Sequence, residues 1–255
     1  MKKTNNIIII CLSLIVILII FIFVGISNGF FNFKRSDEDI QKSKLKSLSS
    51  KLDIMEVKTI PDNLPDDIKQ IIEKDSNKTF DNLNDKTIQF VIDTSTNLND
   101  DEKKALQTAI FNISNKLPTN CNVELITYNS NITVYNNLGA FTDKTKNNFA
   151  TFINLMQNTG HSRIYDSLIY AMNKNIDVNN ANVILISCGP VNYGYTYNDV
   201  KNKLEYIKMP IYTIGYNQTI ETDVLKEISD KTNAKYYDAN EKNIENKLCK
   251  ILENM

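Results

Sequence analysis

Residues 88–97 read IQFVIDTSTN, an apolar run rich in β-branched side chains that changes abruptly to polar residues. A short apolar run of this kind, bounded by turn-forming residues, is typical of a buried β-strand. The stretch therefore predicts a central strand at 88–93, with Asp93 at its carboxyl end.

Similar short apolar runs follow this strand and alternate with amphipathic segments. The alternation predicts an α/β domain with a doubly wound, mostly parallel, six-stranded sheet and helices on both faces. The other strands are expected at 123–129, 132–135 (a short edge strand), 182–187, 210–215 and 234–238. The helices are expected at 100–116, 144–156, 164–174, 198–207, 222–231 and 241–253.

The N-terminal part of the chain has a different character. From Ile7 to Ile26 it carries no charged residue, and a helix of that length can cross a hydrocarbon core of about 30 Å. The run exceeds the apolar region of a cleaved signal peptide, and no A-x-A follows it. We therefore predict a transmembrane anchor in residues 1–33, a charged, partly helical stalk at 34–86, and the α/β domain at 87–255.

The orientation of this anchor rests on few charges. Lys2 and Lys3 precede the span, whereas Lys34 and Arg35 follow it and are succeeded by acidic residues. The difference favours a cytoplasmic N-terminus. The expected location is the membrane, crossed once, with the domain extracellular.

Three polar loops are expected at one edge of the sheet. They are DTSTN (93–97), TGHSRIYD (159–166) and CGP (188–190). In doubly wound sheets, ligands bind at the carboxyl ends of the strands, near the point where the strand order reverses. These loops are therefore the predicted functional site.

The three loops resemble those of the von Willebrand factor A domain family. Its members carry D-x-S-x-S after the first strand, a G-G-T loop before a central helix, and Asp-Gly after the fourth strand. The resemblance runs from Thr87 to the C-terminus, and IYDSLIYAM (164–172) and IYTIGY (211–216) add to it. It implies a metal-ion-dependent adhesion site, in which protein oxygens hold Mg²⁺ and a carboxylate of the partner completes the coordination shell.

The resemblance to that metal site is partial. Asp93 and Ser95 occupy the first two motif positions, and Ser162 takes the place of the loop threonine. Asn97 replaces the second serine. Cys188 replaces the aspartate, which removes a negative charge and places a soft sulfur where a hard oxygen belongs.

The loss of one carboxylate should lower the affinity for Mg²⁺, because charge attraction dominates binding at such a site. We expect a degenerate site with no cofactor. The alternative is a weak Mg²⁺ or Mn²⁺ site, whose ligands would be Asp93, Ser95, Asn97 and Ser162.

A distant alternative uses the residues that depart from the family pattern. His161 replaces the second glycine of the loop, and together with Asp93 and Cys188 it could bind Zn²⁺ or form a thiol nucleophile with its base. A cysteine at a strand end is more often a packed small hydrophobe. We therefore expect that the protein is not an enzyme.

Binding of another protein is the function that the sequence favours. The candidate contact residues lie in the loops expected at the same edge of the sheet, and they are His161, Arg163, Cys188, Tyr193, Tyr195 and Tyr197. The net charge of −1 and the lack of a basic stripe argue against a nucleic-acid partner. No G-x-G-x-x-G motif follows the first strand, and no small-molecule substrate is expected. The alternative is a scaffold subunit of a membrane complex that makes its contacts through a helical face.

Overall fold

A computed structural model of the chain describes residues 36–52, 54–58, 80–190, 193–217 and 222–255. The chain divides into two compact units, Met1–Ile40 and Gln41–Met255. Of the first unit only residues 36–40 are described, and they include the start of helix α2 (Asp37–Ser49). The span predicted at 7–26 lies outside the described residues, and no helix within them is long and apolar enough to cross a membrane.

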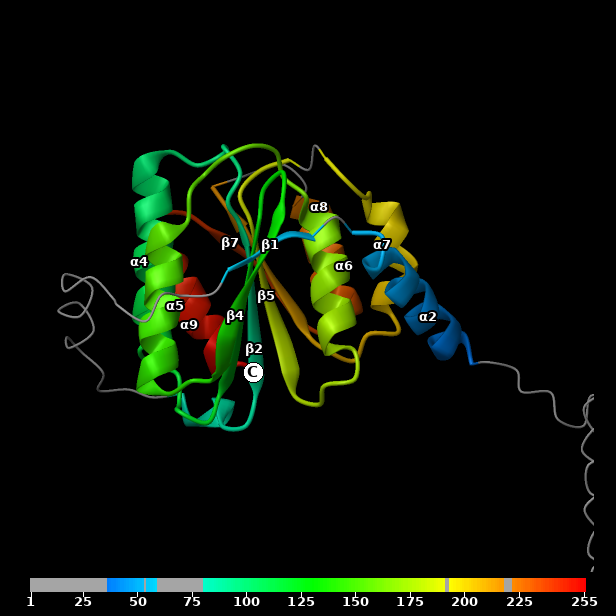
Figure 1. The fold of residues 1–255 in the computed structure, drawn as a ribbon, viewed down its shortest axis with the longest axis horizontal. Helices are drawn as coiled ribbons and strands as arrows, with labels where there is room; N and C mark the ends of the chain where they lie inside the picture. Colours follow the sequence, from blue (N-terminus) through cyan, green and yellow to red (C-terminus); the bar gives the residue numbers. More distant parts are fainter. Residues whose placement is uncertain (1–35, 53, 59–79, 191–192, 218–221) are drawn as a thin grey trace, which may run out of the picture. The chain divides into compact units, whose positions relative to one another are not determined.

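The second unit is built around one seven-stranded sheet in the order β1-β4-β3-β2-β5-β6-β7 (Figure 1). Neighbouring strands are parallel except for β3 and β4, which are antiparallel. The strands are β1 (Ile54–Lys58), β2 (Thr87–Asp93), β3 (Asn122–Tyr128), β4 (Ile132–Ala140), β5 (Ala181–Ser187), β6 (Ile211–Tyr216) and β7 (Tyr236–Ala239).

Helices cover both faces of this sheet, and each face has its own apolar core. The core on one face includes side chains of α4, α5 and α9, and the core on the other includes side chains of α6, α7 and α8 (Figure 1). The helices are α4 (Asp100–Ser114), α5 (Asp143–Leu155), α6 (Ile164–Asn175), α7 (Tyr197–Leu204), α8 (Thr222–Lys231) and α9 (Ile244–Glu253), with a short 3-10 helix at Asp81–Leu83.

The predicted α/β class is confirmed, and the six expected strands are β2 to β7. The expected edge strand at 132–135 is wrong in two respects. It extends to Ala140, and β1 pairs with it in parallel and forms the edge instead. The sequence does not predict β1, because five residues that include Glu56 and Lys58 show too little apolar alternation.

Part of the predicted stalk packs on the domain. Leu45 of α2 is fully buried in the core beside α6 and α7, and Leu48 and Leu52 pack against the same core. Leu45 and Leu48 are three positions apart and therefore lie on one face of α2, and Leu52 continues this inward stripe just beyond the end of the helix. Residues from Gln41 to Lys58 thus add a helix and a strand to the six strands that begin at Thr87.

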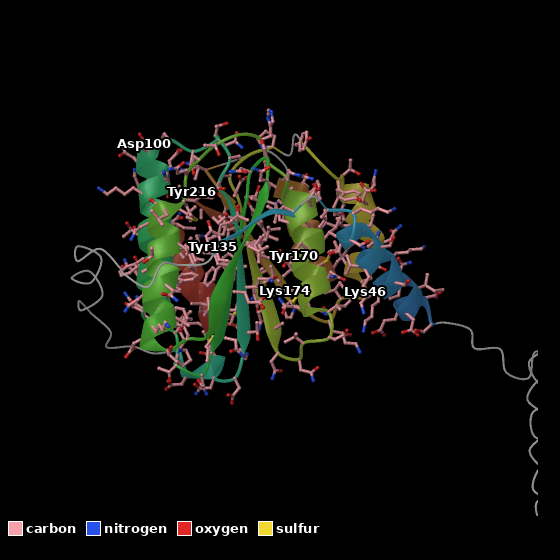
Figure 2. The ribbon with its side chains drawn as sticks, in the orientation of Figure 1. Lys46, Asp100, Tyr135, Tyr170, Lys174 and Tyr216 are labelled. Atoms are coloured by element: carbon pink, nitrogen blue, oxygen red, sulfur yellow. The ribbon has the colours of Figure 1, made fainter. Side chains whose placement is uncertain are left out.

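The strand order reverses between β2 and β5. The chain leaves β2 for β3 and β4 on one side, and returns to β5, β6 and β7 on the other. Two tyrosine hydroxyls donate hydrogen bonds in the carboxyl half of the sheet. That of Tyr128 in β3 donates to the Ile186 carbonyl of β5 at 3.0 Å, and that of Tyr216, labelled in Figure 2, donates to the Glu102 carbonyl of α4 at 2.7 Å. The carboxyl ends of β2 and β5 therefore form a fixed platform.

The buried leucine of α2 gives a direct test of this packing. Replacing Leu45 with Ala should lower the free energy of unfolding by about 2–5 kcal/mol, because it leaves a cavity in the core. Leu155→Ala is the matched control, since the Leu155 side chain is 65% exposed and its loss should cost about 0.5 kcal/mol or less. Urea unfolding of both variants makes the comparison, and equal stabilities would contradict the packing of α2.

Candidate functional site at the carboxyl edge of the sheet

Asp93 connects three segments at the end of β2. Its Oδ1 accepts a hydrogen bond from the Ser95 backbone N–H at 2.9 Å. Its Oδ2 accepts one from the Ser162 hydroxyl at 3.1 Å and one from the Cys188 backbone N–H at 3.2 Å. One carboxylate thus holds together the loops that follow β2, precede α6 and follow β5.

Asn97 contacts the same group of residues through Ser95. Its side-chain nitrogen donates to the Ser95 Oγ at 2.8 Å. Gly189 leaves room for it, because a Cβ at that glycine would lie 2.3 Å from the Asn97 Nδ2. We call Asp93, Ser95, Asn97, Ser162 and Cys188 the Asp93 cluster; the structure brings all five together.

Four of the five members of the Asp93 cluster are shielded from solvent, whereas Asn97 is exposed. Asp93, Ser95 and Ser162 are buried, and Cys188 is only 4% exposed. Burial raises the pKa of Asp93 above its ordinary value, although the hydrogen bonds from Ser95, Cys188 and Ser162 oppose that rise. Burial also raises the pKa of the Cys188 thiol well above its ordinary value, and the neighbouring Asp93 adds to this effect.

The loop before α6 makes hydrogen bonds with two other loops, one after β2 and one between β3 and β4. Gly160 accepts from the Thr96 backbone N–H at 3.2 Å, and the Thr159 backbone N–H donates to the Thr94 carbonyl at 2.9 Å. On the other side, the Ser130 Oγ accepts from the His161 backbone N–H at 2.9 Å. The loop therefore holds Ser162 in the Asp93 cluster, between His161 and Arg163 in the sequence.

Arg163 forms a second cluster beside the first. Its Nη2 lies 2.8 Å from the Asp166 Oδ1, and its Nη1 donates to the Ser130 carbonyl at 3.3 Å. The other oxygen of Asp166 accepts from the Tyr195 backbone N–H at 2.8 Å. Asp166, in the first turn of α6, thus fixes both the arginine and the tyrosine-rich loop after β5.

Gly194 allows that loop to approach Asp166 closely. Its backbone φ is +87°, a value that residues with a Cβ rarely adopt. A Cβ at this position would lie 1.9 Å from the Asp166 Oδ2. The glycine between Tyr193 and Tyr195 is therefore a requirement of the geometry.

Tyr193 is the exposed member of this second cluster. Its ring lies 5.2 Å from the Arg163 guanidinium carbon and 6.2 Å from the His161 ring, with 20° between the two ring planes. The side chain is 55% exposed. We call His161, Arg163, Asp166 and Tyr193 the Tyr193 cluster.

The other two predicted tyrosines have different environments. Tyr195 is half-buried and packs against the core, and its backbone makes the contact with Asp166. Tyr197 is half-buried as well, with its ring 6.0 Å from that of Tyr165 and under the Lys201 ammonium. Of the three tyrosines, Tyr193 therefore presents the largest exposed surface.

A sequence model of the von Willebrand factor type A domain matches residues 87–251. The chain belongs to this family. No curated protein sequence matches the chain.

Solved von Willebrand A structures share the fold at low sequence identity. A von Willebrand factor type A protein from Catenulispora acidiphila is 12% identical with a TM-score of 0.60, over 67% of this chain and 42% of that one. The domain of a type V pili tip protein from Porphyromonas gingivalis is 12% identical with a TM-score of 0.52, over 66% and 94%. An aerotolerance-related membrane protein from Bacteroides fragilis is 11% identical with a TM-score of 0.50, over 67% and 100%. The chain thus spans less than half of the Catenulispora protein.

The Asp93 cluster fits the metal ion of von Willebrand A domains poorly. Its one carboxylate is buried, and both of its oxygens already accept hydrogen bonds from the protein. The Ser95 Oγ accepts from Asn97, which turns its nitrogen toward the serine. Hard divalent cations take oxygen ligands that include charged carboxylates, and this cluster holds a single carboxylate.

The zinc or thiol alternative finds no support in the geometry. Cys188 lies against Asp93, but the His161 ring stacks on Tyr193. Within the described parts of the chain, no group of three or more His, Cys, Asp and Glu side chains could hold a metal ion. The raised pKa of Cys188 further opposes a role as nucleophile.

Sequence reasoning missed Asp166 and Ser130, which position the Tyr193 cluster. Each makes its contacts with residues distant in the chain, such as the bond from Tyr195 to Asp166. Gly194 was the available signal, because a glycine inside an aromatic run indicates close approach of the backbone to another group.

The environment of Cys188 predicts its reactivity. In the folded protein at pH 8, Cys188 should react with iodoacetamide at least about 100-fold more slowly than the partly exposed Cys249, since its thiolate is suppressed. Cys121 should also react slowly, because burial raises its pKa to about 12. Mass spectrometry of the labelled peptides gives the rates, and urea should equalise them. Rapid native labelling of Cys188 would reopen the thiol hypothesis.

Proposed function

We propose that this chain is a membrane-anchored module that binds a protein partner through the Tyr193 cluster, without a metal ion. Domains of its family commonly mediate contacts between proteins. The observation that carries the proposal is Tyr193, an exposed aromatic ring held on the Arg163 guanidinium beside the Asp93 cluster. The N-terminus is cytoplasmic in this proposal, and the domain is extracellular.

The fixed position of Tyr193 favours binding. A side chain that is already ordered loses little conformational entropy when a partner covers it. Tyr and Arg are enriched among the residues that contribute most to protein interfaces. Here the arginine is oriented by Asp166 and Ser130, so the ring above it is a preformed contact surface.

Binding without a metal follows from the charges. In the family pattern, a cation between two aspartates connects the domain to a carboxylate of the partner. Cys188 removes one of those charges, and the remaining one is occupied in holding three loops. The contact surface moves to the neighbouring loop, which carries His161 and Arg163 on either side of Ser162.

The metal hypothesis can be tested by restoring the family pattern. The melting temperature of the natural chain should be the same in EDTA and in excess Mg²⁺ or Mn²⁺. An Asn97→Ser/Cys188→Asp variant should melt lower in EDTA, because a second carboxylate lies near Asp93. With Mg²⁺ it should recover by about 5 °C or more, since a ligand that binds only the folded state stabilises it.

Asn97→Ser/Cys188→Ser is the matched control, because it keeps the small polar side chains and adds no charge. It should not respond to metal ions. Stabilisation of the natural chain by Mg²⁺, lost in Asp93→Ala, would show that the present site binds metal and would overturn this part of the proposal.

Partner contact can be tested with a photo-crosslinking amino acid placed at Tyr193 in the full chain on cells. Crosslinking at this position should capture a partner protein even in the presence of EDTA. The same amino acid at Val178, an exposed residue at the amino edge of the sheet, should capture none. With the captured partner purified, Tyr193→Ala should weaken binding at least tenfold, and Val178→Ala should not.

Crosslinks that form instead from a helical face, with none from Tyr193, would favour the scaffold alternative. An Asp166→Asn variant separates packing from contact. It weakens the support of Arg163 and of the loop but keeps the Tyr193 side chain, so it should reduce affinity less than Tyr193→Ala does.

A further inference from the structure

A short segment near the beginning of the described chain is locally basic, although no basic stripe runs through the chain as a whole. From Gln41 to Leu52 there are four lysines and no acidic residue, although the whole chain has a net charge of −1. Over the longer stretch from Lys34 to Leu52, six basic residues oppose three acidic ones, which are Asp37, Glu38 and Asp39. Those acids form the first turn of α2, where they stabilise the helix N-terminus.

The leucines of α2 point into the core, which leaves its lysines outside. Lys44, Lys46 and Lys51 are exposed, whereas Leu45 is fully buried. Because the inward stripe fixes the rotation of the helix, the lysines cannot turn away from the surface without unpacking it. The helix thus presents a fixed basic surface.

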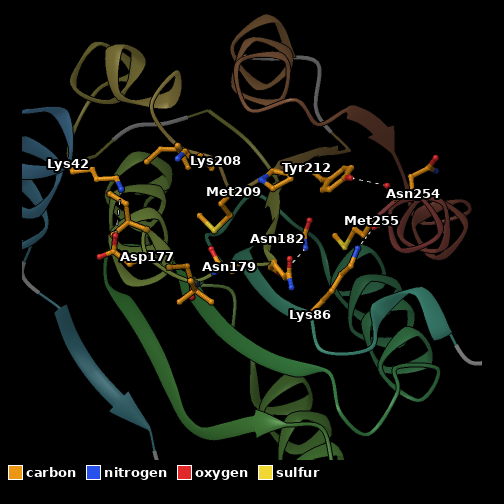
Figure 3. Close-up of a pocket in the computed structure, with 17 residues that line it drawn as sticks. Lys42, Lys86, Asp177, Asn179, Asn182, Lys208, Met209, Tyr212, Asn254 and Met255 are labelled. Atoms are coloured by element: carbon orange, nitrogen blue, oxygen red, sulfur yellow. Dashed lines mark hydrogen bonds and ion pairs between the residues drawn. The ribbon is translucent and has the colours of Figure 1, made fainter. Parts of the chain in front are cut away.

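Further lysines adjoin this surface. Lys42 of α2 lies 3.6 Å from Asp177 and lines a cavity of about 570 Å³ at the amino ends of β5 and β6, together with the exposed Lys208 (Figure 3). Lys203 of α7 donates to the Asp199 carbonyl. Burial lowers the pKa of Lys203, and the nearby positive charge of Lys44 acts in the same direction.

We infer that Lys44 and Lys46 of α2 and Lys51 just after it, extended by Lys42 and Lys208, bind the anionic headgroups of the membrane in which the chain is anchored. We call these five residues the basic face. The inference rests on the proposed anchor and adds a second contact with the same bilayer.

The length of the connecting chain supports the bilayer as the occupant. Only nine residues, 27–35, lie between Ile26, the end of the predicted span, and Ser36, the first described residue. Even fully extended they reach about 35 Å. The connection is therefore short enough for the basic face to touch the bilayer, where each lysine near an anionic surface strengthens association roughly fivefold.

Lysine acetylation tests this inference on the full chain reconstituted in vesicles. Vesicles of phosphatidylcholine are compared with vesicles in which about a third of the lipid is phosphatidylglycerol. The anionic lipid should slow acetylation of Lys44, Lys46 and Lys51 at least threefold. Lys104 and Lys242, which line a groove beside α4 and α9, should react equally in both.

A charge-reversal triple variant, Lys44→Glu/Lys46→Glu/Lys51→Glu, gives the second arm. The variant should remain in the vesicles, because the anchor is unchanged. Anionic lipid should no longer slow the acetylation of its Lys42 and Lys208. Lys104→Glu/Lys242→Glu/Lys250→Glu has the same change in net charge and should keep that protection.

The two proposals fail in different ways. If the full chain does not float with phosphatidylcholine vesicles, the anchor is wrong, whereas flotation with the anionic vesicles alone would still support the basic face. If the chain floats with both kinds and its α2 lysines are acetylated at the same rate, the anchor stands and the basic face is overturned. Protection that persists above about 0.5 M salt would also contradict a headgroup contact, because salt screens exposed charges.

Discussion

The buried carboxylate of Asp93 is the constraint on which the edge of this sheet depends. A charge removed from water is costly unless hydrogen bonds compensate it. Here three donors, from Ser95, Ser162 and Cys188, meet its two oxygens. Those donors come from three loops, so the compensation also fixes the loops relative to one another. The carboxylate has a structural role whether or not a cation is bound near it.

The reversal of strand order explains why these loops meet. Strands β2 and β5 are neighbours in the sheet but far apart in the chain, and the loops that follow them diverge to opposite sides. The loop before α6 enters the space between them and carries Ser162 toward Asp93. Its adjacent residues, His161 and Arg163, contact the surface residue Tyr193 instead. One short loop therefore serves the buried cluster and the exposed one, and a change in either affects the other.

The central strands and part of the Asp93 cluster could be predicted from the sequence, whereas strand β1 and the role of Asp166 could not. The buried strand 88–93 and its successors are strongly apolar, so their positions and class were predictable, as was the convergence of Asp93, Ser95 and Ser162 at one edge. Strand β1 was not, because its place depends on pairing with β4 and not on its own pattern. The role of Asp166 was hidden for a similar reason: its contact with Tyr195 spans 29 positions and depends on Gly194, whose backbone conformation no apolar periodicity reveals.

The two clusters differ in how they compensate charge, and that difference bears on function. Asp93 is stabilised by hydrogen bonds from uncharged groups and is buried. Asp166 is neutralised by Arg163, and this ion pair is nearly buried, with side-chain exposures of 12% and 2%. Removing one partner of such a pair costs far more than the pair itself contributes, so Arg163 is held in place. The guanidinium carbon of this arginine lies 5.2 Å from the centre of the Tyr193 ring, so the exposed ring adjoins the charge pair. A binding surface built on that pair needs no metal ion to be rigid.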